Sequence, residues 1–355
     1  MTLARQKTGL RPSAFCLLPS AFFPPSAFSL LPSSAFRSSA FRLLLCFCLL
    51  PSALSCSAPQ PRFISIATGG TGGVYYPYGG ALARLITEHV PGVQATAEVT
   101  GASVANLQLM QLGKVDLAFT LADTLAEAVR GTGPFAGTGA VGSIRTVAVL
   151  YTNYTHIVAR PGLGIRSVAD LRGRTVSVGA PGSGTELIAD RILLSAGLDG
   201  RRDIRRQALG VLESAGSLKD GKLDAFFWSG GVPTPALQDL AATPGLSLEL
   251  VPHADLLPFL RRDYGRDLYR PAVIPAGAYR DVDRETGTVG VSNVLVASSN
   301  LDDDLVFAIT RVLFEQKDAL VAAHPEARHL VRPETFTGTA ADYHRGAMRF
   351  FQTAK

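Results

Sequence analysis

An alternation of strands and helices that occurs twice constrains the fold more than any other feature of the sequence. Residues 63–120 read as β-α-β-α-β, with the apolar strand FISIAT first and the strand VDLAFT last. Tyr78, Leu82 and Ile86 recur at helical spacing after the first strand, and Pro91-Gly92 ends this predicted helix. Helices placed between strands make consecutive strands parallel. A second unit from about residue 166 has the same order, and its segment GKLDAFFW at 221–228 echoes GKVDLAFT at 113–120. We therefore predict an α/β protein built from two similar lobes.

Two long β-rich stretches flank the second unit and are predicted to cross between the lobes. They are IRTVAVLYTNYTHIV at 144–158 and TVGVSNVLVA at 288–297. An amphipathic helix is predicted over 301–323, because three aspartates at 302–304 suit the positive end of a helix dipole. The tail at 325–355 is expected to pack against the first lobe.

The charge distribution gives no electrostatic reason to expect a nucleic-acid partner. The formal net charge of +5 comes from 34 basic and 29 acidic residues. Five of the basic residues lie in residues 1–56, which hold no acidic residue, so 29 of each sign remain in 57–355. All four cysteines, at positions 16, 46, 48 and 56, lie in the same segment. The body is therefore predicted to lack a disulfide, a cysteine metal site and a cysteine nucleophile.

Residues 1–58 read as a low-complexity leader that ends in a signal peptide. The motif PSAF occurs three times before residue 29, and such repeats do not build a core. Arg37 and Arg42, the apolar stretch Leu43–Leu50 and small residues follow in the order of a secretory signal. The sequence ALSC resembles a lipobox and makes Cys56 a lipidation candidate, while plain cleavage near Ala58 is the alternative. Both predict a periplasmic protein.

The glycine-rich sequence GGTGG at 69–73 is the first candidate ligand site. It lies between a predicted buried strand and a predicted helix. Ligands of open parallel sheets bind beyond the carboxyl ends of strands, and free N–H groups at helix N-termini attract anions. Glycines let a carboxylate approach those groups closely; the alternative is a tight turn followed by core tyrosines. The predicted ligand contacts are Gly70, Thr71, Gly72, Gly73, Tyr75 and Tyr76.

The loop PGSG at 181–184 is a similar device in the second unit. Ser183 and Glu186 fit the S-x-x-E capping box, in which a serine side chain caps the following helix. This structural role is compatible with ligand contact. The predicted ligand contacts here are Ser183, Gly184 and Thr185.

Four further polar or aromatic residues lie near predicted element ends and are additional ligand candidates. They are Ser103, Asn106, Asp123 and Trp228. Each has a structural alternative: Ser103 can cap a helix, Asn106 and Asp123 can cap or face solvent, and Trp228 can belong to the core.

Signatures of catalysis are missing from the sequence. The glycines at 69–73 do not fit G-x-G-x-x-G, and neither a phosphate-binding P-loop nor a G-x-S-x-G nucleophile elbow occurs. The six histidines show no H-E-x-x-H or other metal-ligand spacing. The sequence therefore predicts no metal, no cofactor and no enzyme.

Five sequence blocks, in collinear order over roughly residues 61–350, resemble the solute receptors of TRAP transporters of the TAXI type (TRAP-associated extracytoplasmic immunogenic proteins). They are ISIATGGTGGVYYPYGGALARLI, GASVANLQLMQLGKVDLAFT, VSVGAPGSGTELIADRIL, DAFFWSGGVPTPALQDL and RPAVIPAGAYRDVDRETGTVGVSNVLVAS. The resemblance implies a two-lobe periplasmic binding protein, type II-like, with two parallel-rich sheets and a hinge between the lobes. We assign residues 61–151 plus 293–355 to lobe 1 and 152–292 to lobe 2.

The resemblance also implies a function. Such receptors capture a small carboxylate of the glutamate, glutamine or dicarboxylate class and deliver it to integral-membrane TRAP permease subunits driven by an ion gradient. Where the family commonly has Gln-Ser-Asp after the third strand, this chain has Leu121-Ala122-Asp123, which favours a less polar acid. A monomer is expected. The alternatives are a lipid-anchored ligand-sensing input domain and an enzyme on the same scaffold.

Overall fold

The computed structural model of the protein describes residues 60–337 and 339–353. The predicted leader, its signal peptide and the lipidation candidate Cys56 lie outside the described residues. Residues 59–355 form one structural unit, to which everything below refers.

The first part of this unit repeats the predicted order of strands and helices. Its elements are β1 (Arg62–Ala67), α2 (Tyr75–His89), β2 (Val93–Glu98), α3 (Ser103–Gln111), β3 (Leu117–Leu121), α4 (Ala122–Arg130), η1 (Gly133–Phe135) and β4 (Ile144–Ala159). The β-α-β-α-β prediction for 63–120 is confirmed. Helix α2 ends just before Pro91-Gly92, as the sequence predicts, because proline and glycine do not continue a helix.

The second part starts with a short 3-10 helix and again alternates strands and helices. Its elements are η2 (Val168–Leu171), β5 (Thr175–Ser177), α5 (Gly184–Ser195), β6 (Arg205–Gln207), α6 (Val211–Lys219), β7 (Ala225–Gly230), α7 (Pro235–Ala241), β8 (Glu249–Leu250), η3 (Ala254–Leu256), α8 (Leu257–Tyr264) and β9 (Tyr269–Ile274). The chain then returns through β10 (Thr286–Ser298), α9 (Asp303–Glu315), α10 (Lys317–Ala323), η4 (Pro325–His329) and α11 (Arg345–Thr353).

Two long antiparallel strands cross the molecule, as predicted for 144–158 and 288–297. β1 pairs in parallel with β2 and β3, and β5 pairs in parallel with β6 and β7. One end of β10 pairs with β9 and the other end with β3, while β4 pairs with both β10 and β7. The two predicted parallel groups are thus joined into one sheet, in the order β2-β1-β3-β10-β4-β7-β5-β6. The two predicted parallel-rich sheets correspond to these two groups, which the crossing strands join.

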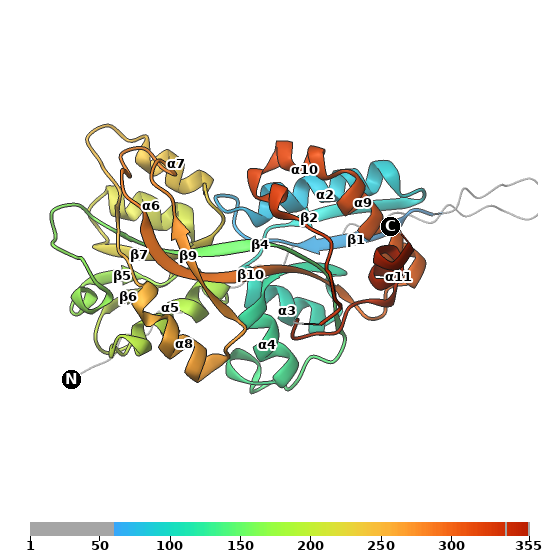
Figure 1. The fold of residues 1–355 in the computed structure, drawn as a ribbon, viewed down its shortest axis with the longest axis horizontal. Coiled ribbons are helices and arrows are strands. Elements are labelled where there is room, and N and C mark those ends of the chain that lie inside the picture. Colours follow the sequence, from blue (N-terminus) through green and yellow to red (C-terminus); the bar gives the residue numbers. More distant parts are fainter. Residues whose placement is uncertain (1–59, 338, 354–355) are drawn as a thin grey trace, which may run out of the picture. The chain divides into compact units, whose positions relative to one another are not determined.

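Helices cover both faces of the sheet on each side of the crossing strands (Figure 1). We call the side with α2, α3, α4, α9, α10 and α11 the first lobe, and the side with α5, α6, α7 and α8 the second lobe. In the first lobe α2 and α9 pack on one face, and α3 and α4 on the other. In the second lobe α5 and α8 pack on one face, and α6 and α7 on the other.

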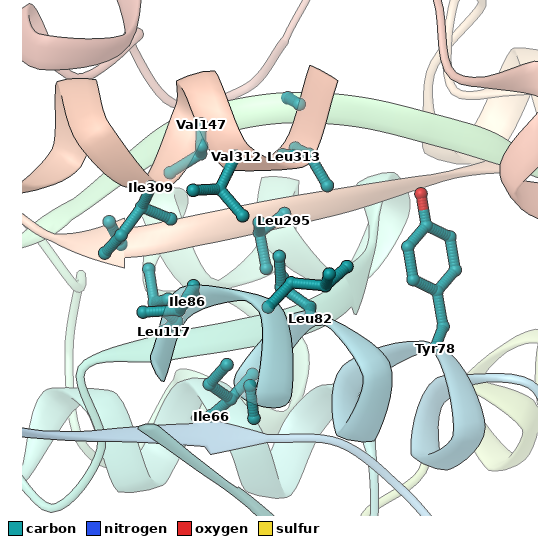
Figure 2. Close-up of a cluster of buried hydrophobic side chains, with 14 of the residues drawn as sticks. Ile66, Tyr78, Leu82, Ile86, Leu117, Val147, Leu295, Ile309, Val312 and Leu313 are labelled. Carbon is teal, nitrogen blue, oxygen red and sulfur yellow. The ribbon is translucent and has the colours of Figure 1, made fainter. Parts of the chain in front are cut away.

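The core between α2, α9 and the sheet illustrates the packing (Figure 2). Tyr78, Leu82 and Ile86 recur every fourth residue along α2, so that they share one helix face, and all three are fully buried. They meet Ile309 and Leu313 of α9 together with apolar strand residues. Burial of a leucine or isoleucine side chain stabilises a fold by ~1.5–3 kcal/mol. This core fixes the start of α2, which borders the candidate site.

Two details of the helices differ from prediction. The cap of α3 is Ala102, at a φ of 75°, and the helix begins at Ser103 instead of being capped by it. The predicted helix over 301–323 is divided into α9 and α10, with Gln316 between them. Its predicted acidic start is confirmed, since the Asp302 carboxylate accepts the N–H groups of Asp304 and Leu305. The tail packs on the first lobe through α11 and α9, as predicted.

Across residues 60–337 and 339–353, no helix combines the length and apolar character that crossing a bilayer requires.

Candidate functional site

A cavity of about 400 Å³ lies at the carboxyl ends of the parallel strands, between the two lobes. Its walls come from the loops that precede α2, α3, α5 and α6, together with the middle of β4 and the ends of β3 and β7. Loops at the carboxyl ends of parallel strands form ligand sites in many α/β proteins. A volume of this size suits a small organic solute.

Four helix N-termini border this cavity. Val74 caps α2, Ser103 and Gly184 are the first residues of α3 and α5, and Gly210 caps α6. All four line the cavity. The first N–H groups of a helix have no acceptor within the helix, and the helix dipole gives that end a partial positive charge. Helix starts that face one cavity favour a negatively charged group inside it.

A chain of hydrogen bonds forms one wall of the cavity and links the lobes. The Tyr75 hydroxyl of α2 donates to Asn293 Oδ1 of β10, and Asn293 Nδ2 donates to Asn153 Oδ1 of β4 at 2.6 Å. Asn153 Nδ2 donates to the Ser229 carbonyl of β7 at 3.2 Å, and the Ser229 N–H donates to Thr185 Oγ1 at 3.2 Å. The β4–β10 register shifts next to Asn293, and such bulges redirect side chains near functional sites.

Hydroxyl groups on this lining keep a proton that they can donate. Ser103 Oγ accepts the Leu121 N–H at 3.2 Å, Ser183 Oγ accepts the Glu186 N–H at 3.0 Å, and Thr185 Oγ1 accepts the Ser229 N–H. A hydroxyl that accepts a hydrogen bond still carries its own O–H donor. Ser183 and Thr185 therefore present donors to an anion bound near the starts of α3 and α5, whereas the Ser103 hydroxyl also hydrogen-bonds to the Tyr75 oxygen.

Tyr151 adds a further hydroxyl to the lining. It is buried, and its oxygen has no hydrogen-bond partner among the residues that the structure describes. Burial raises the pKa of Tyr151 well above its usual value, so the group remains a neutral O–H. An unsatisfied buried hydroxyl is costly, and an acceptor supplied by a solute would remove that cost.

Charged side chains are almost missing from this cavity. Of the lining residues, all of them within the described part of the chain, Glu213 alone carries a charge, and none is Arg, Lys or His. Donors for an anion therefore come from neutral hydroxyls and backbone N–H groups.

The structure brings eight of the predicted contact residues to the cavity. They are Gly70, Gly73, Tyr75, Ser103, Ser183, Gly184, Thr185 and Trp228. Ser183 also caps α5, as predicted, because its side chain accepts the Glu186 N–H. Their contact with a ligand stays a prediction.

Three predicted contacts of the first loop lie outside the lining. Thr71 is exposed, and Tyr76 faces outward on α2 with 37% of its surface accessible. Gly72 instead allows the two lobes to approach: a Cβ there would lie 2.4 Å from the Leu212 side chain, and its carbonyl accepts the Ala236 N–H at 3.3 Å. At least one glycine of this loop, Gly72, is thus required by the contact between the lobes and not by a ligand.

Asn106 and Asp123, also predicted as contacts, have structural partners. Asn106 Nδ2 donates to the carbonyls of Thr68 and Phe119 at 2.7 and 2.8 Å, so it ties three elements of the first lobe together. Asp123 Oδ2 accepts from Arg191 at 3.1 Å and from the Tyr269 hydroxyl at 2.9 Å. Neither lines the cavity.

Two buried polar contacts join the lobes away from the cavity. In one, Arg191 of α5 pairs with Asp123 and Glu127 of α4, and Arg191 and Asp123 are 5% and 0% exposed. In the other, Glu326 of η4 accepts the Val232 N–H at 2.7 Å. Burial raises the pKa of Glu326 to about 7.

Sequence reasoning missed Tyr151, Asn153, Asn293, Ser229 and Glu213. A usable signal existed in the crossing strands, because asparagine is unfavourable inside a strand and both stretches hold one at their centre. Glu213 carries no such signal, since an acidic residue in the first turn of a helix is ordinary.

Comparisons with known proteins agree with this architecture. Residues 66–354 match the family model described as NMT1-like. A solved protein from Bordetella bronchiseptica RB50 is 16% identical with a TM-score of 0.53, and the match covers 82% of this chain and 98% of that one. PhnD1 from Prochlorococcus marinus, solved with methylphosphonate, is 12% identical with a TM-score of 0.53, covering 78% and 94%. These likenesses show the two-lobe fold of periplasmic binding proteins.

Proposed function

The chain belongs to the NMT1-like family, and from this premise and the cavity we propose that it is an extracytoplasmic receptor for a small carboxylate. The observation that carries the proposal is the convergence of the starts of α2 and α3 of the first lobe and α5 of the second on one cavity. A carboxylate there accepts N–H and O–H donors from both lobes. No cation is needed for this binding.

The crossing strands supply the mechanism of capture. We assign residues 61–151 plus 293–355 to lobe 1 and 152–292 to lobe 2, with the hinge in β4 and β10. A solute that accepts hydrogen bonds from both lobes binds the closed arrangement more tightly than the open one, so binding shifts the population toward closure. The interlobe contacts of Gly72 and Glu326 then become part of the closed form.

A binding screen tests this function. The exported protein is unfolded, dialysed and refolded to remove any co-purified acid, and its thermal unfolding is measured with glutamate, glutamine, 2-oxoglutarate and straight-chain acids. A ligand at ~100 times its Kd stabilises by ~2.7 kcal/mol, which is a shift of several degrees. A shift without product formation is expected. Product formation supports the enzyme alternative, and the lack of any shift contradicts the proposal.

The membrane partner in this proposal is a TRAP permease, which the five sequence blocks support. Uptake into vesicles that hold the permease subunits should require this protein and an ion gradient, without ATP. Uptake that depends on ATP hydrolysis would assign the receptor to another transporter class, and binding to a histidine kinase would favour the sensor alternative.

The chain is proposed to be a periplasmic monomer. Incorporation of radiolabelled palmitate, with Cys56→Ser as control, decides whether the protein carries a lipid anchor.

A further inference from the structure

Glu213 lies in a position where its carboxylate can interact electrostatically with a bound solute. It is in the first turn of α6 and is the one charged side chain among the described residues that line the cavity. Its carboxylate folds back over Gly210, because a Cβ added to Gly210 would lie 2.4 Å from Glu213 Oε2. A carboxylate at this place complements the dipole of α6. The carboxylate of Glu213 therefore already occupies the N-terminus of α6, where an anionic solute would otherwise bind.

The starts of α3 and α5 offer the better place for the solute's own carboxylate. A Cβ on Gly184 would lie 2.8 Å from Ser103 Oγ, so the two helix starts adjoin across the lobe boundary. Ser183 and Thr185 each keep an O–H donor there, and the Ser103 hydroxyl, which also contacts the Tyr75 oxygen, lies beside them. One carboxylate is thus accommodated by donors from both lobes.

A second carboxylate on the same solute finds no cationic side chain, and only the start of α2 and the Tyr151 hydroxyl remain as donors for it. The lining has no basic side chain, and much of the remaining surface is apolar, including Leu121, Val211 and Trp228. A buried anion without a partner is costly, and the negative charge of Glu213 adds repulsion.

Resting on the proposed function, we infer that Glu213 is a specificity-determining residue that restricts the site to acids with a single carboxylate and rejects dicarboxylates. The rest of such a solute is neutral or cationic, and an apolar body suits the lining. Across a partly solvated cavity the repulsion between two carboxylates amounts to about a tenfold difference in Kd.

Matched acid pairs test this role. The pairs are hexanoate with adipate and glutamine with glutamate, since each differs by one carboxylate at nearly constant length. Calorimetric titration gives the ratio of dissociation constants within each pair for the wild type, for Glu213→Gln and for Asp239→Asn. Asp239 is an exposed acid of α7 in the same lobe and lies outside the cavity lining, so its variant controls for net charge.

The wild type and Asp239→Asn should bind the monocarboxylate of a pair about tenfold more tightly than its partner, and Glu213→Gln should narrow this ratio severalfold. A purely structural role in capping α6 would weaken both acids alike and leave the ratio unchanged, which would overturn the inference. Equal binding of both acids by the wild type would also overturn it. If the wild type binds no acid of either pair or of the earlier screen, the proposed function itself fails.

Discussion

Single residues at the lobe boundary decide how closely the two lobes can approach. Gly231 faces Glu326 so closely that a Cβ would lie 2.4 Å from Glu326 Cγ, and the neighbouring Val232 N–H donates to Glu326 Oε1. Glu326 Oε2 has no hydrogen-bond partner among the described residues. A half-satisfied buried carboxyl is sensitive to protonation, because its neutral form loses less hydration on burial.

The raised pKa of Glu326 predicts a pH-dependent stability. Burial lifts its pKa from 4.5 to about 7, so the folded protein holds this proton more tightly than the unfolded chain. The stabilisation that this proton uptake adds to the unfolding free energy is complete below the pKa of the unfolded chain, and it is lost as the pH rises through 7. From pH 5 to 8 the wild type should therefore lose about 2–3 kcal/mol of unfolding free energy relative to Glu326→Gln, which keeps the carbonyl acceptor for Val232.

Denaturant unfolding at several pH values measures this difference in unfolding free energy. The basic residues around Glu326 are Arg328, whose charge lowers the Glu326 pKa, and His324 and His329, whose own pKa values are lowered by burial. His329→Gln, which removes the 3.8 Å contact to Glu326 Oε2, serves as the control and should keep the pH profile. Parallel profiles for the wild type and Glu326→Gln would rule out this role of the carboxyl.

Helix α2 contains two adjacent glycines with opposite surroundings. A Cβ on Gly79 would lie 2.4 Å from Thr68 Cγ2 and 3.2 Å from Phe119, whereas one on Gly80 would meet nothing within 4 Å. Gly79 thus lets α2 approach the end of β1 and the core strand β3. Gly80 has no packing role and only lowers the helix propensity.

Alanine at these two positions should therefore change stability in opposite directions. Gly80→Ala is expected to stabilise the protein by about 0.4–1 kcal/mol, because it reduces the freedom of the unfolded chain without a clash. Gly79→Ala should destabilise it by about 1–3 kcal/mol, because the added methyl overfills a packed core. Urea unfolding of both variants decides the matter. Equal effects would show that the environment of α2 differs from the one described.

The elements of this fold were largely predictable from the sequence, and the lobe contacts were not. Helical spacing of Tyr78, Leu82 and Ile86 and the stop at Pro91 are local signals, and both predicted α2 correctly. The role of Gly72 depends on Leu212, which lies 140 positions away in the chain, and no local pattern records such a partner. The cavity follows the same rule: its glycine loops were found, whereas Asn153 and Glu213 were missed.

At the level of the whole molecule, the proposed balance between open and closed arrangements depends on the buried contacts between the lobes. The Arg191 cluster draws Asp123 and Glu127 from the first lobe and Tyr269 from the second, and Arg191 Nη1 also contacts Tyr269 Oη at 2.5 Å. Such a cluster gains its energy only while both lobes contribute. It lies outside the cavity lining, so its effect on solute binding must pass through closure.

Asp123→Asn should therefore weaken solute binding without touching the solute. Loss of one partner of a buried ion pair typically costs 3–5 kcal/mol. Glu127 still pairs with Arg191 in this variant, so we expect a cost at the lower end of that range, and opening of the lobes lets water relieve Arg191. We expect a lower unfolding free energy, a Kd raised at least about tenfold, and a larger radius of gyration in small-angle scattering of the solute-free protein.

The control is Glu88→Gln, which breaks the exposed Arg84–Glu88 pair of α2. An exposed pair of this kind contributes only about 0.3–0.5 kcal/mol. If Asp123→Asn lowers stability but leaves both Kd and the radius of gyration at wild-type values, the cluster supports folding only, and closure must depend on the contacts around Glu326 and the solute itself.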